Sequence, residues 1–130
     1  MRLLLDTHAL LWFLREPDKF PPNVLEEIES AGTEALVSVA SLWEIAIKAS
    51  LKKLYLPKEY DELFPKSVLD SGLSLLPIDP QHISVLSRLP WHHRDPFDRM
   101  LIAQAQVENL RVVSRDPQFP PYGVHVLWNM

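Results

Sequence analysis

With 130 residues, 47% of them hydrophobic, the chain has enough apolar material for one compact core and too little for two, so we expect a single domain over residues 1–130. The absence of cysteine excludes disulfides and thiolate metal sites. A net charge of -4 argues against a broad electrostatic grip on nucleic acid, so any contact with a polynucleotide must be local.

The apolar segments are all short. The first apolar run, 3–5, is too short for a signal peptide and is followed by Asp6, and no later run approaches the length of a membrane span. Together with the lack of cysteine, this predicts a soluble protein of the cytoplasm.

Strand-like apolar runs alternate with helical patterns along the chain. In chain order the pattern predicts a strand over 3–5, helices over 8–15 and 21–31, a strand over 35–39, a helix over 41–53, a helical region over 59–71, a strand over 73–78, a helix from the cap at 79 to 89, a loop over 90–95, a helix over 96–109, and strands over 112–114 and 124–128. The helix over 41–53 is apolar on most sides and is expected to be mostly buried. Pro65 interrupts the region over 59–71.

This alternation predicts an α/β fold, with a mainly parallel five-stranded sheet covered by helices on both faces. In such sheets, ligands bind beyond the carboxyl ends of the strands, near the point where the strand order reverses. Asp6 follows the first strand directly and Asp116 follows the strand over 112–114. If those two strands are neighbours, both acids lie within reach of one ion.

Four acidic residues follow predicted strands or lie near the start of predicted helices: Asp6, Glu44, Asp98 and Asp116. Brought together by the fold, four carboxylates repel one another, and the natural occupant of such a pocket is a hard divalent cation with oxygen ligands. The leading hypothesis from the residues is therefore a metal-dependent phosphoryl-transfer site.

Each acid also has a purely structural explanation. Asp6 can cap the first helix, and Asp116 before a proline can be part of a turn. Glu44 has the spacing of a capping box with Ser41 and of a helical ion pair with Lys48. Asp98 can lie in the first turn of its helix, where the helix dipole favours an anion.

The set is harder to dismiss than its members. Glu44 lies in the apolar stretch 42–47, where a carboxylate is costly unless it is paired or bound to a metal. One shared site explains the four acids more simply than four separate coincidences.

Four segments carry a family resemblance: LLDTH at 4–8, SLWEIAIK at 41–48, DPFDRMLIAQA at 95–105 and VSRD at 113–116. In order and spacing they closely resemble the successive motifs of PIN-domain ribonucleases, especially VapC-type toxins of prokaryotic toxin–antitoxin pairs. The resemblance spans nearly the whole chain.

The resemblance implies a PIN-like three-layer α/β/α sandwich and an endoribonuclease that depends on Mg²⁺ or Mn²⁺. The family's acidic catalytic and metal-binding quartet falls on Asp6, Glu44, Asp98 and Asp116, and its supporting hydroxyl positions fall on Thr7 and Ser114. Asp95 competes with Asp98 for the third acidic position, and we favour Asp98 because Asp95 is suited to capping the helix. The cations would activate a water for attack on the phosphodiester, so no side-chain nucleophile is required.

Basic residues near the acids in the sequence are predicted RNA contacts: His92, His93, Arg94, Arg99 and Arg115. The structural alternative is that they are only exposed. The five histidines show no zinc-site spacing, which argues against a zinc hydrolase.

The stretch 51–64 interrupts its apolar residues with prolines and lysines, which indicates partial exposure and a protein interface. By the resemblance, the partners would be a second copy of the chain and a cognate antitoxin protein that covers the acidic site, in a homodimer or a toxin–antitoxin hetero-oligomer.

Two other functions remain open. One is a non-catalytic binding or signalling module, PIN-like or receiver-like, although a receiver would carry paired acids after the first strand and a phospho-accepting Asp after the third. The other is a DNA-cleaving nuclease, because metal–carboxylate chemistry does not by itself distinguish ribose from deoxyribose.

Overall fold

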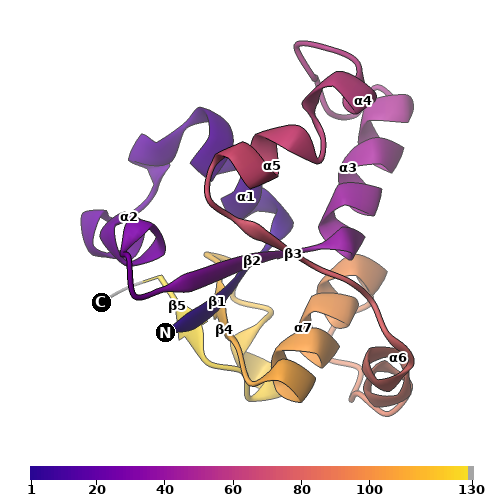
Figure 1. Cartoon of the computed structure of the whole chain (residues 1–130). Coiled ribbons are helices and arrows are strands. Elements are labelled where there is room, and N and C mark those ends of the chain that lie inside the picture. Colours follow the sequence, from indigo (N-terminus) through magenta and orange to yellow (C-terminus); the bar gives the residue numbers. More distant parts are fainter. Residues whose placement is uncertain (129–130) are drawn as a thin grey trace.

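In the computed structural model, which describes residues 1–128, five strands form one sheet in the order β3-β2-β1-β4-β5 (Figure 1). All four neighbouring pairs are parallel. The strands are β1 (Arg2–Leu5), β2 (Glu34–Ser38), β3 (Ser74–Leu76), β4 (Arg111–Val113) and β5 (Val126–Leu127). The mainly parallel sheet predicted from the sequence is therefore confirmed.

The connections between the strands are helical. The α-helices are α1 (Thr7–Arg15), α2 (Pro22–Glu29), α3 (Val39–Ser50), α4 (Tyr60–Leu63), α5 (Lys66–Asp70), α6 (Pro80–Leu86) and α7 (Pro96–Glu108). Two short 3₁₀ helices, η1 (Pro17–Lys19) and η2 (Pro120–Tyr122), begin at prolines and were not predicted. None of the helices in the described part of the chain has the length and apolar character needed to cross a bilayer.

The strands bury side chains on both faces of the sheet, which creates two cores. Leu3 and Leu5 of β1 point into a core shared with α1, α2, α3 and α5, whereas Leu4 points into a second core shared with α6, α7 and η2. Leu3, Leu4 and Leu5 are all fully buried. The result is the predicted three-layer α/β/α sandwich (Figure 1).

The direction of strand addition reverses at β1. From β1 the chain adds β2 and then β3 on one side, and it then returns to add β4 and β5 on the other. Leu5 of β1 pairs with Val113 of β4, and the Asp6 amide continues this ladder by donating to the Val113 carbonyl (3.1 Å). The residues after both strands therefore leave the sheet side by side, at the point where parallel sheets bind ligands.

Helix α3 begins two residues earlier than predicted. Ser38 is its N-cap, with its hydroxyl accepting a hydrogen bond from the Ala40 amide (3.0 Å), so Val39 belongs to the helix and not to the strand. The expectation that α3 is mostly buried is correct only for its first half. Trp43 is 59% exposed, and the second half is only half-buried at one edge of the molecule (Figure 1).

The region over 59–71 forms two short helices, α4 and α5, on either side of Pro65, as a proline inside a helical pattern requires. The other predicted elements are present with ends shifted by a few residues.

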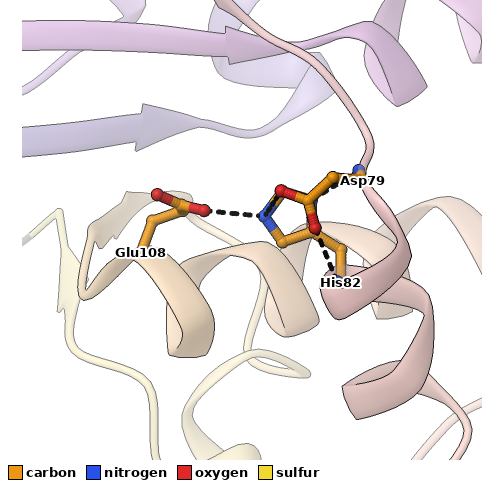
Figure 2. Close-up of side chains that lie close together, drawn as sticks. All are labelled: Asp79, His82 and Glu108. Carbon is orange, nitrogen blue, oxygen red and sulfur yellow. Dashed lines mark hydrogen bonds and ion pairs between the residues drawn. The ribbon is translucent and has the colours of Figure 1, made fainter.

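Helices α6 and α7 are joined through a fully buried histidine, His82 (Figure 2). Asp79 caps α6 by accepting from the Gln81 and His82 amides, and in return the Asp79 amide donates to His82 Nδ1 (3.1 Å). Because Nδ1 is the acceptor, Nε2 carries the proton and donates to Glu108 Oε2 on α7 (2.9 Å). The imidazole thus links the first turn of one helix to the last turn of the other.

Asp79, His82 and Glu108 also place ligand atoms within 4.8 Å of one another, as a metal site would. The hydrogen bonds argue against that role, since the Nε2 lone pair is occupied by its proton and the Nδ1 lone pair by the Asp79 amide. We interpret the trio as a structural link.

We predict that His82→Ala lowers the free energy of unfolding by about 2–3 kcal/mol, because it opens a cavity and leaves a capping amide without its acceptor. Thermal and denaturant unfolding would measure the loss. The matched control is His125→Ala, which truncates an exposed histidine and should have almost no effect. Equal stability of the two variants would show that the link contributes nothing.

Candidate active site

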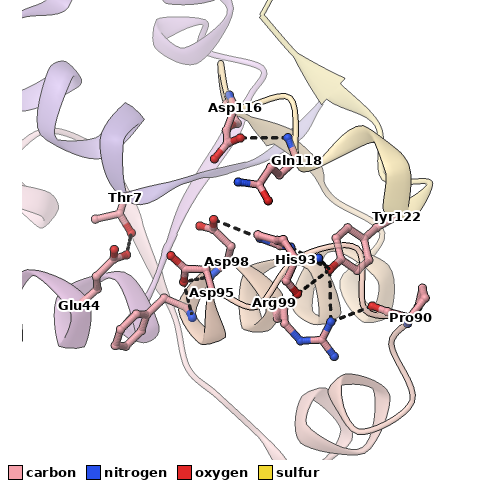
Figure 3. Close-up of polar contacts among 12 residues, drawn as sticks. Thr7, Glu44, Pro90, His93, Asp95, Asp98, Arg99, Asp116, Gln118 and Tyr122 are labelled. Carbon is pink, nitrogen blue, oxygen red and sulfur yellow. Dashed lines mark hydrogen bonds and ion pairs between the residues drawn. The ribbon is translucent and has the colours of Figure 1, made fainter.

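A pocket of about 130 Å³ lies at the carboxyl ends of β1 and β4. It is lined by side chains from both strand ends and from helices of both layers: Asp6, Thr7, His8, Glu44, Lys48, Asp95, Asp98, Asp116 and Gln118. Figure 3 shows six of them, Thr7, Glu44, Asp95, Asp98, Asp116 and Gln118. All four acids singled out in the sequence therefore face one space, although they are up to 110 positions apart in the chain.

Asp6 both caps a helix and faces the pocket. Its Oδ1 accepts a hydrogen bond from the Ala9 amide at the start of α1 (2.7 Å), and the Ser114 hydroxyl binds the same carboxylate. The side chain is only 5% exposed. The capping role proposed as an alternative is thus real, and it fixes the direction in which the carboxylate points.

Glu44 enters the pocket from the second turn of α3. The Thr7 hydroxyl donates to its Oε1 (2.6 Å), and Lys48 Nζ donates to its Oε2 (2.6 Å), which confirms the predicted helical ion pair. The proposed capping box with Ser41 is wrong, because Ser38 caps α3 and Ser41 lies inside the helix. The Ser41 hydroxyl is 3.0 Å from that of Thr7 and supports it.

Asp95 and Asp98 divide two tasks at the start of α7. Asp95 is the N-cap, and its Oδ1 accepts from the Phe97 and Asp98 amides (2.9 and 3.1 Å). The Asp98 carboxylate is not used in capping and lies 3.3 Å from His93 Nε2. That imidazole is held by the Tyr122 hydroxyl, 2.8 Å from Nδ1, so the hydrogen bonds are satisfied when Nε2–H donates to Asp98.

Asp116 approaches from the loop after β4. Its Oδ1 accepts from the Gln118 amide (2.9 Å), which forms the turn suggested by the following proline, and its own amide donates to the Ser114 hydroxyl (2.9 Å). Ser114 therefore contacts both Asp6 and the Asp116 segment.

The carboxylates outweigh the positive charge around them. Burial, offset in part by hydrogen bonds, raises the pKa of Asp6. Burial, followed by the negative charges of Asp95, Asp6, Glu44 and Asp116, raises the pKa of Asp98 to about 8. Lys48 is committed to Glu44, and that hydrogen bond raises the pKa of the ammonium. The pocket thus favours a bound proton or an added cation.

The donor set fits a hard divalent cation, since carboxylate oxygens suit Mg²⁺ and Mn²⁺ better than softer metals. Among residues 1–128, three or more ligating side chains approach within 4.8 Å of one another only in the Asp79, His82 and Glu108 trio. The acids of the pocket therefore lie farther apart than side chains that already surround a metal ion. Mutual repulsion between carboxylates that lack a counter-charge would produce this spacing.

The structure contradicts the predicted RNA contact of Arg99 and places His93 beside one of the acids. Arg99 is 3% exposed, and its guanidinium donates to the Pro90 and Leu89 carbonyls (2.8 and 3.3 Å) while lying 3.7 Å from the centre of the Trp91 ring. It fixes the loop before α7 and is not available to RNA. His93 is turned inward to Asp98 and Tyr122, so it belongs to the acidic site (Figure 3).

The remaining predicted contacts, His92, Arg94 and Arg115, are exposed, and their RNA role stays a prediction. Arg115 lies beside the acidic pocket, next to Asp116. Sequence reasoning did not single out Gln118, Tyr122 or the pairing of His93 with Asp98. Tyr122 lies 29 positions from His93, so no local signal marks it, whereas His93 and Gln118 lie within five residues of the acids that they contact.

Fold and site together define an α/β protein with a carboxylate pocket at the switch point of a parallel sheet. The chain belongs to the PIN domain family, whose model matches residues 3–123. The family predicted from the order of the motifs is confirmed, and a receiver-like module is not supported.

Several solved structures share the fold of this chain. The structure of VapBC2 from Rickettsia felis, bound to a DNA fragment from the VapBC2 promoter, superposes with a TM-score of 0.76 at 15% identity, over 99% of this chain and 100% of that chain. VapBC-1 from nontypeable Haemophilus influenzae gives a TM-score of 0.69 at 13% identity, over 98% and 97% of the two chains. FitAcB from Neisseria gonorrhoeae gives 0.59 at 19% identity, over 96% of each. No curated protein matches the chain significantly in sequence.

The raised pKa of Asp98 predicts how stability depends on pH. An ordinary aspartate has a pKa of about 4, so between that value and about 8 the folded state holds a proton that the unfolded chain has released. The free energy of unfolding of the metal-free protein should therefore fall as the pH rises from about 5 to about 8. Thermal unfolding with a chelator present would measure this slope.

Asp98→Asn removes the titrating carboxyl, so this variant should lose less stability over the same pH range. Asp61→Asn, at an exposed acid outside the pocket, should keep the wild-type slope. Identical slopes for wild type and Asp98→Asn would contradict the prediction.

Proposed function

We propose that the protein is a metal-dependent endoribonuclease that acts as the toxin of a toxin–antitoxin pair. The observation that carries this proposal is the convergence of Asp6, Glu44, Asp98 and Asp116 on one pocket at the switch point of the sheet. Membership of the PIN domain family supports the nuclease class, and the motif resemblance to VapC-type toxins supports RNA as the substrate.

The four carboxylates would hold Mg²⁺ or Mn²⁺. When bound, the cation lowers the pKa of a coordinated water and neutralises negative charge at the phosphodiester. The donor set supports this assignment, because it offers several oxygen ligands and no thiolate.

The supporting residues hold the carboxylates in fixed orientations. Thr7 and Lys48 each hold one oxygen of Glu44, so this side chain faces the pocket in a fixed rotamer. Ser114 restrains Asp6 and the Asp116 turn together. Asp98, with its raised pKa, gives up a proton when a cation arrives, so cation binding strengthens as the pH rises toward about 8.

A cognate antitoxin is the proposed protein partner, as the VapBC names of two similar structures suggest. A groove of about 360 Å³ along α1, α4 and α5 offers apolar surface for such a contact, with Leu11, Leu14, Leu63 and Phe64 among its lining residues. Tyr55, 77% exposed, adds to the apolar surface of the stretch 51–64. The chain would act on RNA in the cytoplasm, as a homodimer or in a toxin–antitoxin hetero-oligomer.

The competing proposal is a PIN-like domain that binds RNA or protein without cleaving. The raised pKa of Asp98 favours the enzyme, because a pocket that only binds an anionic polymer gains nothing from uncompensated carboxylates.

We predict that antitoxin-free protein cuts members of a panel of structured RNAs, including transfer and ribosomal RNA, in Mg²⁺ or Mn²⁺ but not with a chelator. Asp98→Asn should lower the cleavage rate by at least about a hundredfold, because the lost charge weakens cation binding. Product mapping on gels measures both effects, and DNA of matched sequence tests the choice of sugar.

Asp61→Asn is the matched control and should cut like wild type. Retained cleavage by folded Asp98→Asn would remove Asp98 from the site. A folded wild-type protein that cuts no RNA and shows no Mg²⁺ or Mn²⁺ binding by calorimetry would favour the non-catalytic module, and cleavage of the DNA alone would overturn the ribonuclease assignment.

A further inference from the structure

A second, larger pocket of about 410 Å³ adjoins the acidic pocket and shares Asp6, His8 and Asp116 with it. Its other lining residues are Trp12, Arg115 and Pro117, and we name it the Trp12 pocket. Its volume falls in the usual range of small-molecule sites, roughly 300–1,000 Å³. It is open to solvent, and whatever occupies it lies directly beside the acids.

The wall of the Trp12 pocket is aromatic and well supported. The His8 and Trp12 rings lie one helical turn apart on α1 and are nearly parallel, at 21° with centroids 5.9 Å apart. Behind them, Trp12 packs against Phe20 and Trp128 at centroid distances of 6.4 and 5.7 Å. These contacts hold the indole in place, so the wall is formed before any ligand arrives.

Positive charge gathers at the same wall. The Arg115 guanidinium carbon lies 5.4 Å from the Trp12 ring centroid, and Lys19 Nζ lies 5.9 Å from it. In a chain with a net charge of -4, two cations beside one half-buried aromatic side chain form a local anion-attracting surface. Because the whole protein is acidic, a polynucleotide can bind only where basic residues gather locally, and this surface is such a place.

We propose that the Trp12 pocket binds an unpaired nucleotide of the RNA strand, adjacent to the phosphodiester that lies over the acids. The base stacks on the wall of His8 and Trp12, and Arg115 contacts a flanking phosphate. Aromatic rings and arginine planes are the usual platforms for single-stranded RNA, and stacking tolerates any base. This inference rests on the proposed ribonuclease function and deepens it by assigning a binding site next to the cut.

The arrangement of charge favours a polynucleotide over a peptide. An RNA strand repeats one phosphate per nucleotide, so one phosphate can meet Arg115 while the next meets a cation held by the acids. A basic peptide side chain near Asp6 and Asp116 would be repelled by Arg115, which lines the same pocket, and by Lys19 beside Trp12.

The test compares Arg115→Ala and His8→Ala with Arg111→Ala. Arg111 is the first residue of β4, and Arg115 comes two residues after the end of that strand. Arg111 is exposed at the opposite end of the sheet. Its variant therefore loses one positive charge, as Arg115→Ala does, but at a place far from both pockets. Because Arg115 and His8 are exposed, their variants should fold. The probe is a fluorescent twelve-nucleotide oligouridylate bound in Ca²⁺, with fluorescence anisotropy recorded over a range of salt concentrations.

Arg115→Ala should weaken binding about tenfold and lower the slope of log affinity against log salt by about 0.7, the loss of one phosphate contact on a single strand. His8→Ala should weaken binding with the slope unchanged, because it removes only stacking. Arg111→Ala should match wild type. The same oligonucleotide carrying 4-thiouridine should photocrosslink to peptides that contain Trp12 or His8.

None of these measurements requires cleavage. Failure of the ribonuclease proposal can therefore be distinguished from failure of the proposed nucleotide site in the Trp12 pocket. Crosslinking at Trp12 in a protein that cuts nothing would keep the binding site and remove the nuclease. Two results would overturn the Trp12 pocket as an RNA site even if the protein cleaves RNA with a metal. The first is crosslinking only to other peptides, and the second is binding by Arg115→Ala and His8→Ala that is as tight as by Arg111→Ala. Either result would favour a protein partner as the occupant of the pocket.

Discussion

The parallel pairing of β1 with β4 is the constraint on which the rest of the site depends. Leu5 and Val113 are paired, and the Asp6 amide extends the ladder to the Val113 carbonyl. Asp6 and the Ser114–Asp116 loop therefore leave the sheet at the same point. Because β1 is the central strand and contributes to both cores, its end cannot move without disturbing both helical layers.

That fixed geometry brings carboxylates together against their mutual repulsion. Local hydrogen bonds offset part of the cost, since Glu44 is held by Thr7 and Lys48. The compensation is incomplete, as the raised pKa values of Asp6 and Asp98 show. Such uncompensated charge is typical of functional sites, where a ligand supplies what the protein lacks. The packing of the fold therefore supports a pocket that is electrostatically unfavourable without a cation.

Structural and functional explanations of the acids turn out to be compatible. Asp6 caps α1 and Asp116 closes a turn, and both still face the pocket. Capping orients a carboxylate without covering it, because one oxygen accepts the backbone amide while the other remains available. At the start of α7 the tasks are separated, with Asp95 capping and Asp98 free to face the other acids.

The sequence alone determined the features that depend on neighbours within a few residues or on simple periodicity. The order of strands and helices, the acids at their ends, and the Glu44–Lys48 pair follow from local rules, since their partners are fixed by the geometry of one helix or strand end. Only the tertiary structure decided the strand order, the burial of Arg99, the contact between His93 and Asp98, and the second pocket beside the acids. Most of these features depend on segments far apart in the chain. His93 and Asp98 are only five residues apart, but Tyr122, which contacts both His93 and Arg99, comes from η2, and no local pattern encodes that packing.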